Sequence, residues 1–373
     1  MSDNPLTSAK RVVIKIGSAL LVDEAHGTVH RKWLEALAQD IARMKDRGQD
    51  VIIVSSGAIA VGRRYLGLAD GDLMLDEKQA AAATGQIRLA HAYQDVLGHH
   101  DITVSQMLVT LQDTENRRRY LNARSTLDAI LRLGAIPLIN ENDTVATDEI
   151  RFGDNDRLGA RVAAMASADA LVLLSDIDGL YTANPSEDSA AQHIPTVAAI
   201  TPDIEAMAGG SSTNVGSGGM VTKLAAAKIC LQNGCAMAIT LGEGDHPLKR
   251  LEDGTRSTWF IPSLTPAKAR KRWIAGSLKA HGQLVLDAGA LSALKSGKSL
   301  LPIGVTAVEG VFDKGDAVAI VDTKGQELAR GLSSYTSEDA KKIIGKRSGE
   351  IEDILGYRGR DELVHRDDMV VKE

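Results

Sequence analysis

The sequence predicts an α/β fold built on a mainly parallel sheet, followed by a smaller β-rich domain. Between residues 11 and 241, short apolar runs rich in β-branched residues alternate with longer segments whose apolar residues recur every three or four positions. Most of the short runs are almost continuously apolar, as expected for strands that helices cover on both faces. After Pro262, short alternating stretches punctuated by glycine replace this pattern.

Six segments carry the strand pattern of the first domain, and five segments between them carry the helical pattern. The strands are predicted at residues 12–16, 51–54, 102–109, 135–139, 170–174 and 236–241. The covering helices are predicted at residues 33–47, 77–97, 113–133, 157–166 and 221–232. We assign the first domain to residues 1–262, a linker to residues 263–280 and the second domain to residues 281–373. The second domain has candidate strands at residues 304–311, 317–321 and 327–332.

Composition excludes several classes of protein. The chain has 373 residues, of which 44% are apolar and 25% charged, as in folded globular proteins. A net charge of −6 and an aromatic content of 3% argue against a protein devoted to nucleic-acid backbones. The N-terminus lacks a secretory signal, and no stretch approaches the roughly 20 apolar residues of a membrane helix. We therefore expect a cytoplasmic protein without a membrane partner.

The two cysteines, Cys230 and Cys235, lie in a stretch rich in alanine and leucine without histidine neighbours. We predict buried, reduced cysteines and neither a disulfide framework nor a zinc site. The familiar nucleotide signatures are also absent. The nearest match to a P-loop, at residues 292–299, has Ser292 in place of the first glycine, and no G-x-G-x-x-G follows a strand.

Three glycine-rich junctions are expected at the carboxyl ends of strands, where α/β sheets bind their ligands. Lys15 stands near the end of the first strand, where an ammonium in an apolar run needs an anion or an open site. Ser56 begins the turn into a helix whose N-terminus suits a carboxylate or phosphate. Residues 216–223 open another helix, with Lys223 in a first turn that gives a cation no electrostatic benefit. A bound phosphate would explain that lysine. The alternatives are a lysine at the sheet edge, a simple helix cap and a flexible surface loop.

Two acidic, amide-rich clusters, at residues 140–143 and 153–156, also lie beyond strand ends. Either cluster could be an Asx turn or a helix cap. Two of them within 17 residues favour a polar ligand that carries an amino group, because Asp and Asn oxygens accept hydrogen bonds from an ammonium.

Seven motifs in register resemble the ordered motif set of the glutamate 5-kinases, which belong to the amino-acid kinase family. The motifs begin at Lys15, Val54, Leu121, Ile139, Phe152, Ser175 and Gly216. Residues 297–305 and 327–332 resemble the PUA domain that bacterial members append. The resemblance covers essentially the whole chain and implies a three-layer α/β/α sandwich with nucleotide and amino acid bound along the carboxyl edge of the sheet.

The activity that the resemblance implies is the ATP-dependent phosphorylation of the γ-carboxylate of L-glutamate, the first step of proline biosynthesis, with feedback inhibition by proline. Lys15 and Lys223 would neutralise the transferring phosphoryl group, and Asp156 would hold the two lysines. Glutamate would be bound by Ser56, Asp143 and Asn155. ATP would be bound by Lys15, Ser175, Asp176, Ser217, Gly218, Gly219, Met220, Val221, Thr222 and Lys223.

Mg²⁺ would accompany ATP on phosphate and water ligands, so we predict no dedicated protein site for a metal. We also expect a homo-oligomer and the hand-over of the acyl phosphate to a glutamyl-phosphate reductase. Three alternatives stay open. The chain could phosphorylate another small acid, such as aspartate or N-acetylglutamate; it could bind RNA through the PUA-like domain, which the acidic first domain disfavours; or its tail could be purely structural.

Overall fold

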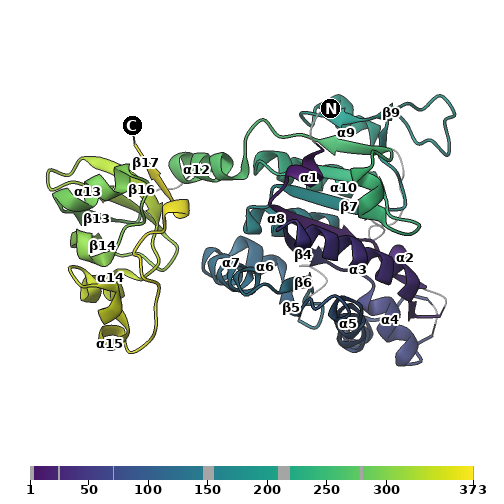
Figure 1. The fold of residues 1–373 in the computed structure, drawn as a ribbon, viewed down its shortest axis with the longest axis horizontal. Helices are drawn as coiled ribbons and strands as arrows, with labels where there is room; N and C mark the ends of the chain where they lie inside the picture. The colour runs from purple at the N-terminus through teal and green to yellow at the C-terminus, as the bar shows by residue number, and fades with distance from the viewer. Residues whose placement is uncertain are drawn as a thin grey trace. The chain divides into compact units, whose positions relative to one another are not determined.

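The computed structural model describes residues 4–23, 26–69, 71–145, 155–208, 219–277 and 280–372. The chain divides into two units, which we describe separately (Figure 1). The first comprises residues 1–115 and 122–266, and the second comprises residues 116–121 and 267–373. None of the helices within the described ranges is long and apolar enough to cross a membrane.

The first unit is built on an eight-stranded sheet with the strand order β10-β12-β11-β7-β1-β4-β6-β5. Six adjacent strands of this sheet run parallel and share one carboxyl edge, namely β11, β7, β1, β4, β6 and β5. β12 runs antiparallel to β11. The strands are β1 (Arg11–Ile16), β4 (Asp50–Val54), β5 (Val104–Val109), β6 (Ile136–Glu141), β7 (Ala170–Ser175), β10 (Thr196–Val197), β11 (Ala236–Leu241) and β12 (Ser257–Phe260). All six strands predicted for this domain are confirmed.

Helices cover both faces of this sheet. They are α1 (Pro5–Ser8), α2 (Ser18–Leu21), α3 (Arg31–Asp46), α4 (Ala58–Tyr65), α5 (Leu75–Gly98), α6 (Leu111–Glu115), α7 (Arg117–Arg132), α8 (Asn155–Ala166), α9 (Pro202–Met207), α10 (Met220–Gln232) and α11 (Pro247–Glu252). Two short hairpins accompany them, formed by β2 (Val22–Asp23) with β3 (Thr28–Val29) and by β8 (Leu180–Tyr181) with β9 (His193–Ile194).

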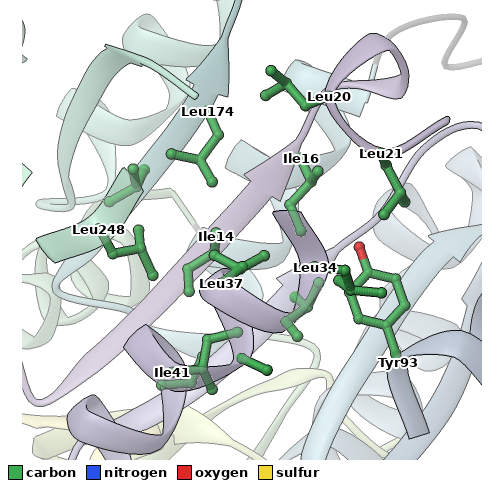
Figure 2. Packing of buried hydrophobic residues seen from close by; sticks show 14 of the residues in the cluster. Ile14, Ile16, Leu20, Leu21, Leu34, Leu37, Ile41, Tyr93, Leu174 and Leu248 are labelled. Carbon is green, nitrogen blue, oxygen red and sulfur yellow. The ribbon is translucent and has the colours of Figure 1, made fainter. Parts of the chain in front are cut away.

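Alternate residues of the central strands enter two separate cores. Ile14 of β1 belongs to the core that contains side chains of α3 and α5, part of which Figure 2 shows. Val13, its neighbour, belongs to the core that contains side chains of α7, α8 and α10. This alternation follows from the two-residue period of a strand. It confirms a three-layer α/β/α sandwich and places the side chain of Lys15 on the α8 side.

The predicted helix at residues 113–133 is wrong in one respect, because the structure has two helices there, α6 and α7. The side chain of Asn116 accepts a hydrogen bond of 3.1 Å from the backbone N–H of Arg119, so this residue caps the start of α7. A second correction concerns α5, which starts two residues earlier than predicted and ends one residue later.

The second unit has its own core and a five-stranded sheet with the order β14-β13-β15-β16-β17. The strands are β13 (Gly282–Leu286), β14 (Val305–Gly310), β15 (Ala317–Val321), β16 (Glu327–Leu332) and β17 (Met369–Val371). The helices are α12 (Pro266–Ser277), α13 (Ala288–Lys295), α14 (Ser337–Ile343) and α15 (Ile351–Leu355). The three strands predicted here are confirmed, β13 and β17 are additional, and α12 occupies most of the segment assigned to a linker.

Candidate active site

The candidate site lies at the carboxyl edge of the eight-stranded sheet. β1 pairs with β7 on one side and with β4 on the other, so Lys15, near its end, occupies a central strand. The glycine-rich turns after β1 and β4 and the polar cluster after β6 reach the same edge, because these strands are parallel. The sequence could predict this convergence, since every one of these segments follows a strand.

Two lysines from distant parts of the chain meet at one buried carboxylate. The Nζ atom of Lys15 lies 2.7 Å from Oδ1 of Asp156, and the Nζ atom of Lys223 lies 3.4 Å from Oδ2. The Asp156 side chain is fully buried, and the lysine side chains are 11% and 5% exposed. Asp156 stands in the first turn of α8, and Lys223 in the first turn of α10.

The two nearby ammonium groups explain why the pKa of Asp156 is low. Burial raises the pKa of the Asp156 carboxyl group. The opposite effect comes from the charges of Lys15 and Lys223 and from hydrogen bonds with Lys15 and Thr222. These contacts outweigh burial and hold the pKa of Asp156 below its ordinary value. Two ammonium groups therefore meet at one point of the sheet edge. Ammonium groups form strong, charge-assisted hydrogen bonds with anions, so the pair suits an anionic ligand.

Thr222 is an additional contact of the same carboxylate. Its Oγ1 atom lies 3.1 Å from Oδ2 of Asp156 and 2.7 Å from the carbonyl oxygen of Gly219. Gly219 is the N-cap residue of α10, so the hydroxyl of Thr222 links the start of α10 to Asp156. The resemblance assigned Thr222 to ATP, and it gave no sign of this contact.

A second cluster forms where β4 turns into α4. The side-chain amide of Asn155 donates to the carbonyl oxygen of Ser55 at 3.0 Å and to Oγ of Ser56 at 2.6 Å. Gly57 follows with φ at +92°, a conformation that glycine adopts without strain, and it forms the N-cap of α4. The structure thus brings together Ser56 and Asn155, two of the three residues predicted for the amino acid.

The third of these residues, Asp143, lies two positions after the end of β6 and is partly buried. Between β6 and Asn155 there is a further link, because Oδ1 of Asn140 lies 3.4 Å from the amide nitrogen of Asn155. Asn140 itself is buried and accepts the backbone N–H of Glu141. The end of β6 therefore contacts the Ser56 turn through Asn155.

The residues predicted for ATP follow β7 and open α10. Ser175 is buried, and its hydroxyl donates to Oδ1 of Asp176 at 2.9 Å. Its backbone carbonyl oxygen accepts the backbone N–H of Gly242 at 2.7 Å. Gly219 precedes α10, whose first residues are Met220 and Val221, and Val221 is 61% exposed. Two other predicted residues, Ser217 and Gly218, and the motif at residues 152–154 lie outside the described residues.

The site also contains a contact that the sequence analysis missed. The hydroxyl of Tyr93 on α5 lies 3.2 Å from Oγ of Ser55, and both side chains are buried. The available signal was weak: a tyrosine at four-residue spacing from Leu89 and Leu97 is typical of a core position, and only its hydroxyl requires a polar partner.

Comparisons with known proteins agree with this architecture. The model of the amino acid kinase family matches residues 10–240, and the model of the PUA domain matches residues 282–355. A glutamate 5-kinase of Paramagnetospirillum magneticum is 65% identical over 99% of this chain and 100% of its own. Those of Rhodospirillum rubrum and Rhizobium etli are 62% and 58% identical, over 96% and 99% of this chain and 96% and 95% of their own.

Proposed function

The chain belongs to the amino acid kinase family and, within it, to the glutamate 5-kinases, and from this premise we propose which of its residues perform the reaction. The reaction is the transfer of the γ-phosphoryl group of ATP to the γ-carboxylate of L-glutamate. The observation that carries the residue assignment is the meeting of Lys15 and Lys223 at Asp156.

The strand order supports a division of the site into two halves. Of the proposed nucleotide residues, Ser175 ends β7 and Asp176 follows it, and β7 is one neighbour of β1. The proposed glutamate residue Ser56 follows β4, which is the other neighbour. Lys15, on β1, stands between them. A group transferred from one half to the other would pass this lysine. For this reason we propose that Lys15, with Lys223 beside it at Asp156, binds the transferring phosphoryl group.

The chemistry requires positioning and charge neutralisation more than proton transfer. A glutamate side chain with an ordinary pKa of about 4.3 is already ionised at neutral pH, so no general base is needed. One carboxylate oxygen attacks the γ-phosphorus, the bond from phosphorus to the bridging oxygen breaks, and ADP leaves with the electron pair. Lys15 and Lys223 would offset the repulsion between the two anions and the charge on the equatorial oxygens.

Asp156 would act as a positioning residue for the two ammonium groups. Its carboxylate faces Lys15, Lys223 and the hydroxyl of Thr222, an arrangement that suits a charge clamp and does not suit a metal ligand. We propose that Mg²⁺ binds to the phosphates of ATP and to water, because this ion dehydrates reluctantly. Bound there, the ion would supply further neutralisation of phosphate charge.

The glutamate half would recognise the amino acid through polar groups at the ends of β4 and β6 and at the start of α8. Asn155 and Ser56 are already joined by a hydrogen bond of 2.6 Å, so their orientation is fixed before a ligand arrives. Asp143 would receive the α-ammonium group, because a carboxylate is the strongest acceptor for it. We further propose that proline competes for this half of the site, that the protein is a homo-oligomer, and that a reductase consumes the acyl phosphate.

The experiment that tests the proposal is an ADP-release assay across a panel of amino acids that includes glutamate, aspartate and N-acetylglutamate. Hydroxylamine in the assay traps an acyl phosphate as a hydroxamate. We expect ADP and hydroxamate in equal amounts with glutamate alone. A filter-binding assay with structured RNA at several salt concentrations tests the alternative function of the PUA domain, and tight binding with little ADP release would favour it.

A further inference from the structure

We propose that Tyr93 is a positioning residue for glutamate and that it acts through the hydroxyl of Ser55. The inference rests on the proposed function, because it concerns the glutamate half of that site. The hydroxyl of Tyr93 contacts Ser55, the residue before the proposed glutamate residue Ser56, so we expect its effect to pass through Ser55.

Tyr93 is a polar exception within an apolar core. It is 1% exposed and belongs to the same cluster as Ile16, Leu21 and Leu34, where Figure 2 shows its hydroxyl oxygen among hydrocarbon side chains. Burying a hydroxyl costs free energy unless it finds a hydrogen-bond partner. Burial also raises the pKa of Tyr93 well above its ordinary value, so the hydroxyl keeps its proton at neutral pH. A phenylalanine would fill the same space without this requirement.

Ser55, the partner of Tyr93, connects this core to the candidate site. Its hydroxyl lies 3.2 Å from the hydroxyl of Tyr93, and its backbone N–H donates to the carbonyl oxygen of Ile139 on β6 at 2.9 Å. Its own carbonyl oxygen accepts the side-chain amide of Asn155. Ser55 is therefore fixed at three atoms, and one of these bonds leads directly to a residue assigned to glutamate.

Helix α5 supports the same edge of the sheet at a second point. Gln86 lies seven residues before Tyr93 and so occupies the same face of the helix. Its side-chain amide donates to the carbonyl oxygen of Glu141, the last residue of β6, at 3.4 Å. One face of α5 thus contacts the turn after β4 and the end of β6, and Ser56 and Asp143 follow these two strands. Loss of the Tyr93 contact should therefore loosen the turn after β4 at Ser55, while the Gln86 contact still holds the end of β6.

The test compares steady-state kinetics of the full-length wild type with Tyr93→Phe, Ser55→Ala and the double variant. The matched control is Tyr335→Phe, because Tyr335 is 2% exposed and donates its hydroxyl to the carbonyl oxygen of Arg360 in the second unit. For Tyr93→Phe we expect the KM for glutamate to rise by about fivefold to tenfold, the loss typical of one hydrogen bond. The KM for ATP should change by less than about twofold.

The double variant distinguishes a shared contact from two independent effects. If Tyr93 acts through Ser55, the KM for glutamate of the double variant should equal that of the more affected single variant. Should Tyr93→Phe fail to fold, Ser55→Ala makes the same comparison from the other partner. Equal rises in the KM for both substrates, or a KM for glutamate as in Tyr335→Phe, would overturn the inference while the proposed function stands. A wild type that releases no ADP with glutamate would refute both.

Discussion

Gly85 of α5 lies so close to Ala58 of α4 that a Cβ atom at Gly85 would stand 1.8 Å from the carbonyl oxygen of Ala58. The relation is reciprocal, because a Cβ atom at Gly62 of α4 would stand 1.7 Å from the carbonyl oxygen of Ala81 of α5. Two glycines therefore let the backbones of these helices touch. Since Ala58 begins α4 directly after the Ser56 turn, the contact reaches the candidate site.

Gly85→Ala should destabilise the first unit by at least about 1–3 kcal/mol, because the added methyl group meets a backbone oxygen that can move only with its helix. The matched control is Gly98→Ala on the same helix, since nothing lies within 4 Å of a Cβ atom there. Urea unfolding followed by circular dichroism measures both variants. Equal stability of the two variants would contradict the close contact.

Lys223→Ala should lower kcat by roughly two to three orders of magnitude, which corresponds to about 2.7–4 kcal/mol of lost transition-state stabilisation. The reason is the position of its ammonium group, next to Asp156 and in a first helical turn that favours anions. Lys228→Ala is the control, because Lys228 lies on the same helix and pairs at the surface with Glu205. Near-normal turnover in Lys223→Ala would refute its catalytic assignment.

Asp156→Asn should remove part of the pH dependence of stability. The pKa of Asp156 is lower in the folded state than its ordinary value of about 3.9, so the carboxylate stabilises the fold above that value. This contribution is lost as the pH falls through the folded-state pKa. Unfolding experiments from pH 7 to pH 2 should therefore show a shallower acid decline for Asp156→Asn.

At pH 7, the same variant should be less stable than the wild type by about 3–5 kcal/mol, because the ammonium groups of Lys15 and Lys223, 11% and 5% exposed, lose a negative partner. Asp188→Asn, at an exposed position, is the control and should follow the wild type over the whole pH range. If both variants showed the same acid decline as the wild type, the stabilising role of Asp156 would be excluded.

The fold was predictable because its signals are local. Almost continuous apolar runs gave the parallel strands, and Lys15 was notable because an ammonium inside such a run needs a partner. The partner itself was not predictable from spacing alone, because Asp156 belongs to a helix more than a hundred residues further along the chain. The resemblance to the glutamate 5-kinases supplied the pairing of Lys15 with Asp156. Both residues lie within residues 10–240, which the model of the amino acid kinase family matches.

Contacts between side chains in the core could not be predicted from the sequence. Tyr93 has the spacing of an ordinary apolar residue, and its bond to Ser55 depends on how α5 lies against the sheet. Likewise, α6 and α7 are separate because Asn116 caps the start of α7, whereas the sequence pattern predicted one continuous helix. The roles assigned to the site residues and the domain boundaries at residues 262 and 281 remain predictions.

Asp143→Ala should raise the KM for glutamate by tenfold or more while leaving the KM for ATP nearly unchanged. A carboxylate that binds an ammonium contributes a charge-assisted hydrogen bond, which is stronger than a neutral one. The ATP residues Ser175 and Asp176 lie at the end of β7, on the other side of β1, so they should be unaffected. Initial rates over a matrix of both substrates measure the two constants. Equal loss for both substrates would mean that Asp143 organises the whole site.

Proline should inhibit the enzyme in competition with glutamate. Proline carries the α-carboxylate and the cationic nitrogen of an amino acid but lacks the γ-carboxylate expected near Ser56. The groups proposed for the α-ammonium, Asp143 and Asn155, could accept its nitrogen, so one ligand would exclude the other without a separate regulatory pocket. Initial rates across glutamate concentrations at several fixed proline concentrations measure the effect.

Competition predicts that saturating glutamate restores the full rate and that Asp143→Ala weakens inhibition by proline together with glutamate binding. The two losses should be similar in size, because both ligands would lose the same charge-assisted bond. An unchanged KM with a falling maximum rate would instead indicate a distant site linked to the first. If proline inhibited Asp143→Ala as strongly as the wild type, the two ligands would not share Asp143. If millimolar proline did not inhibit the wild type, the regulation itself would be refuted.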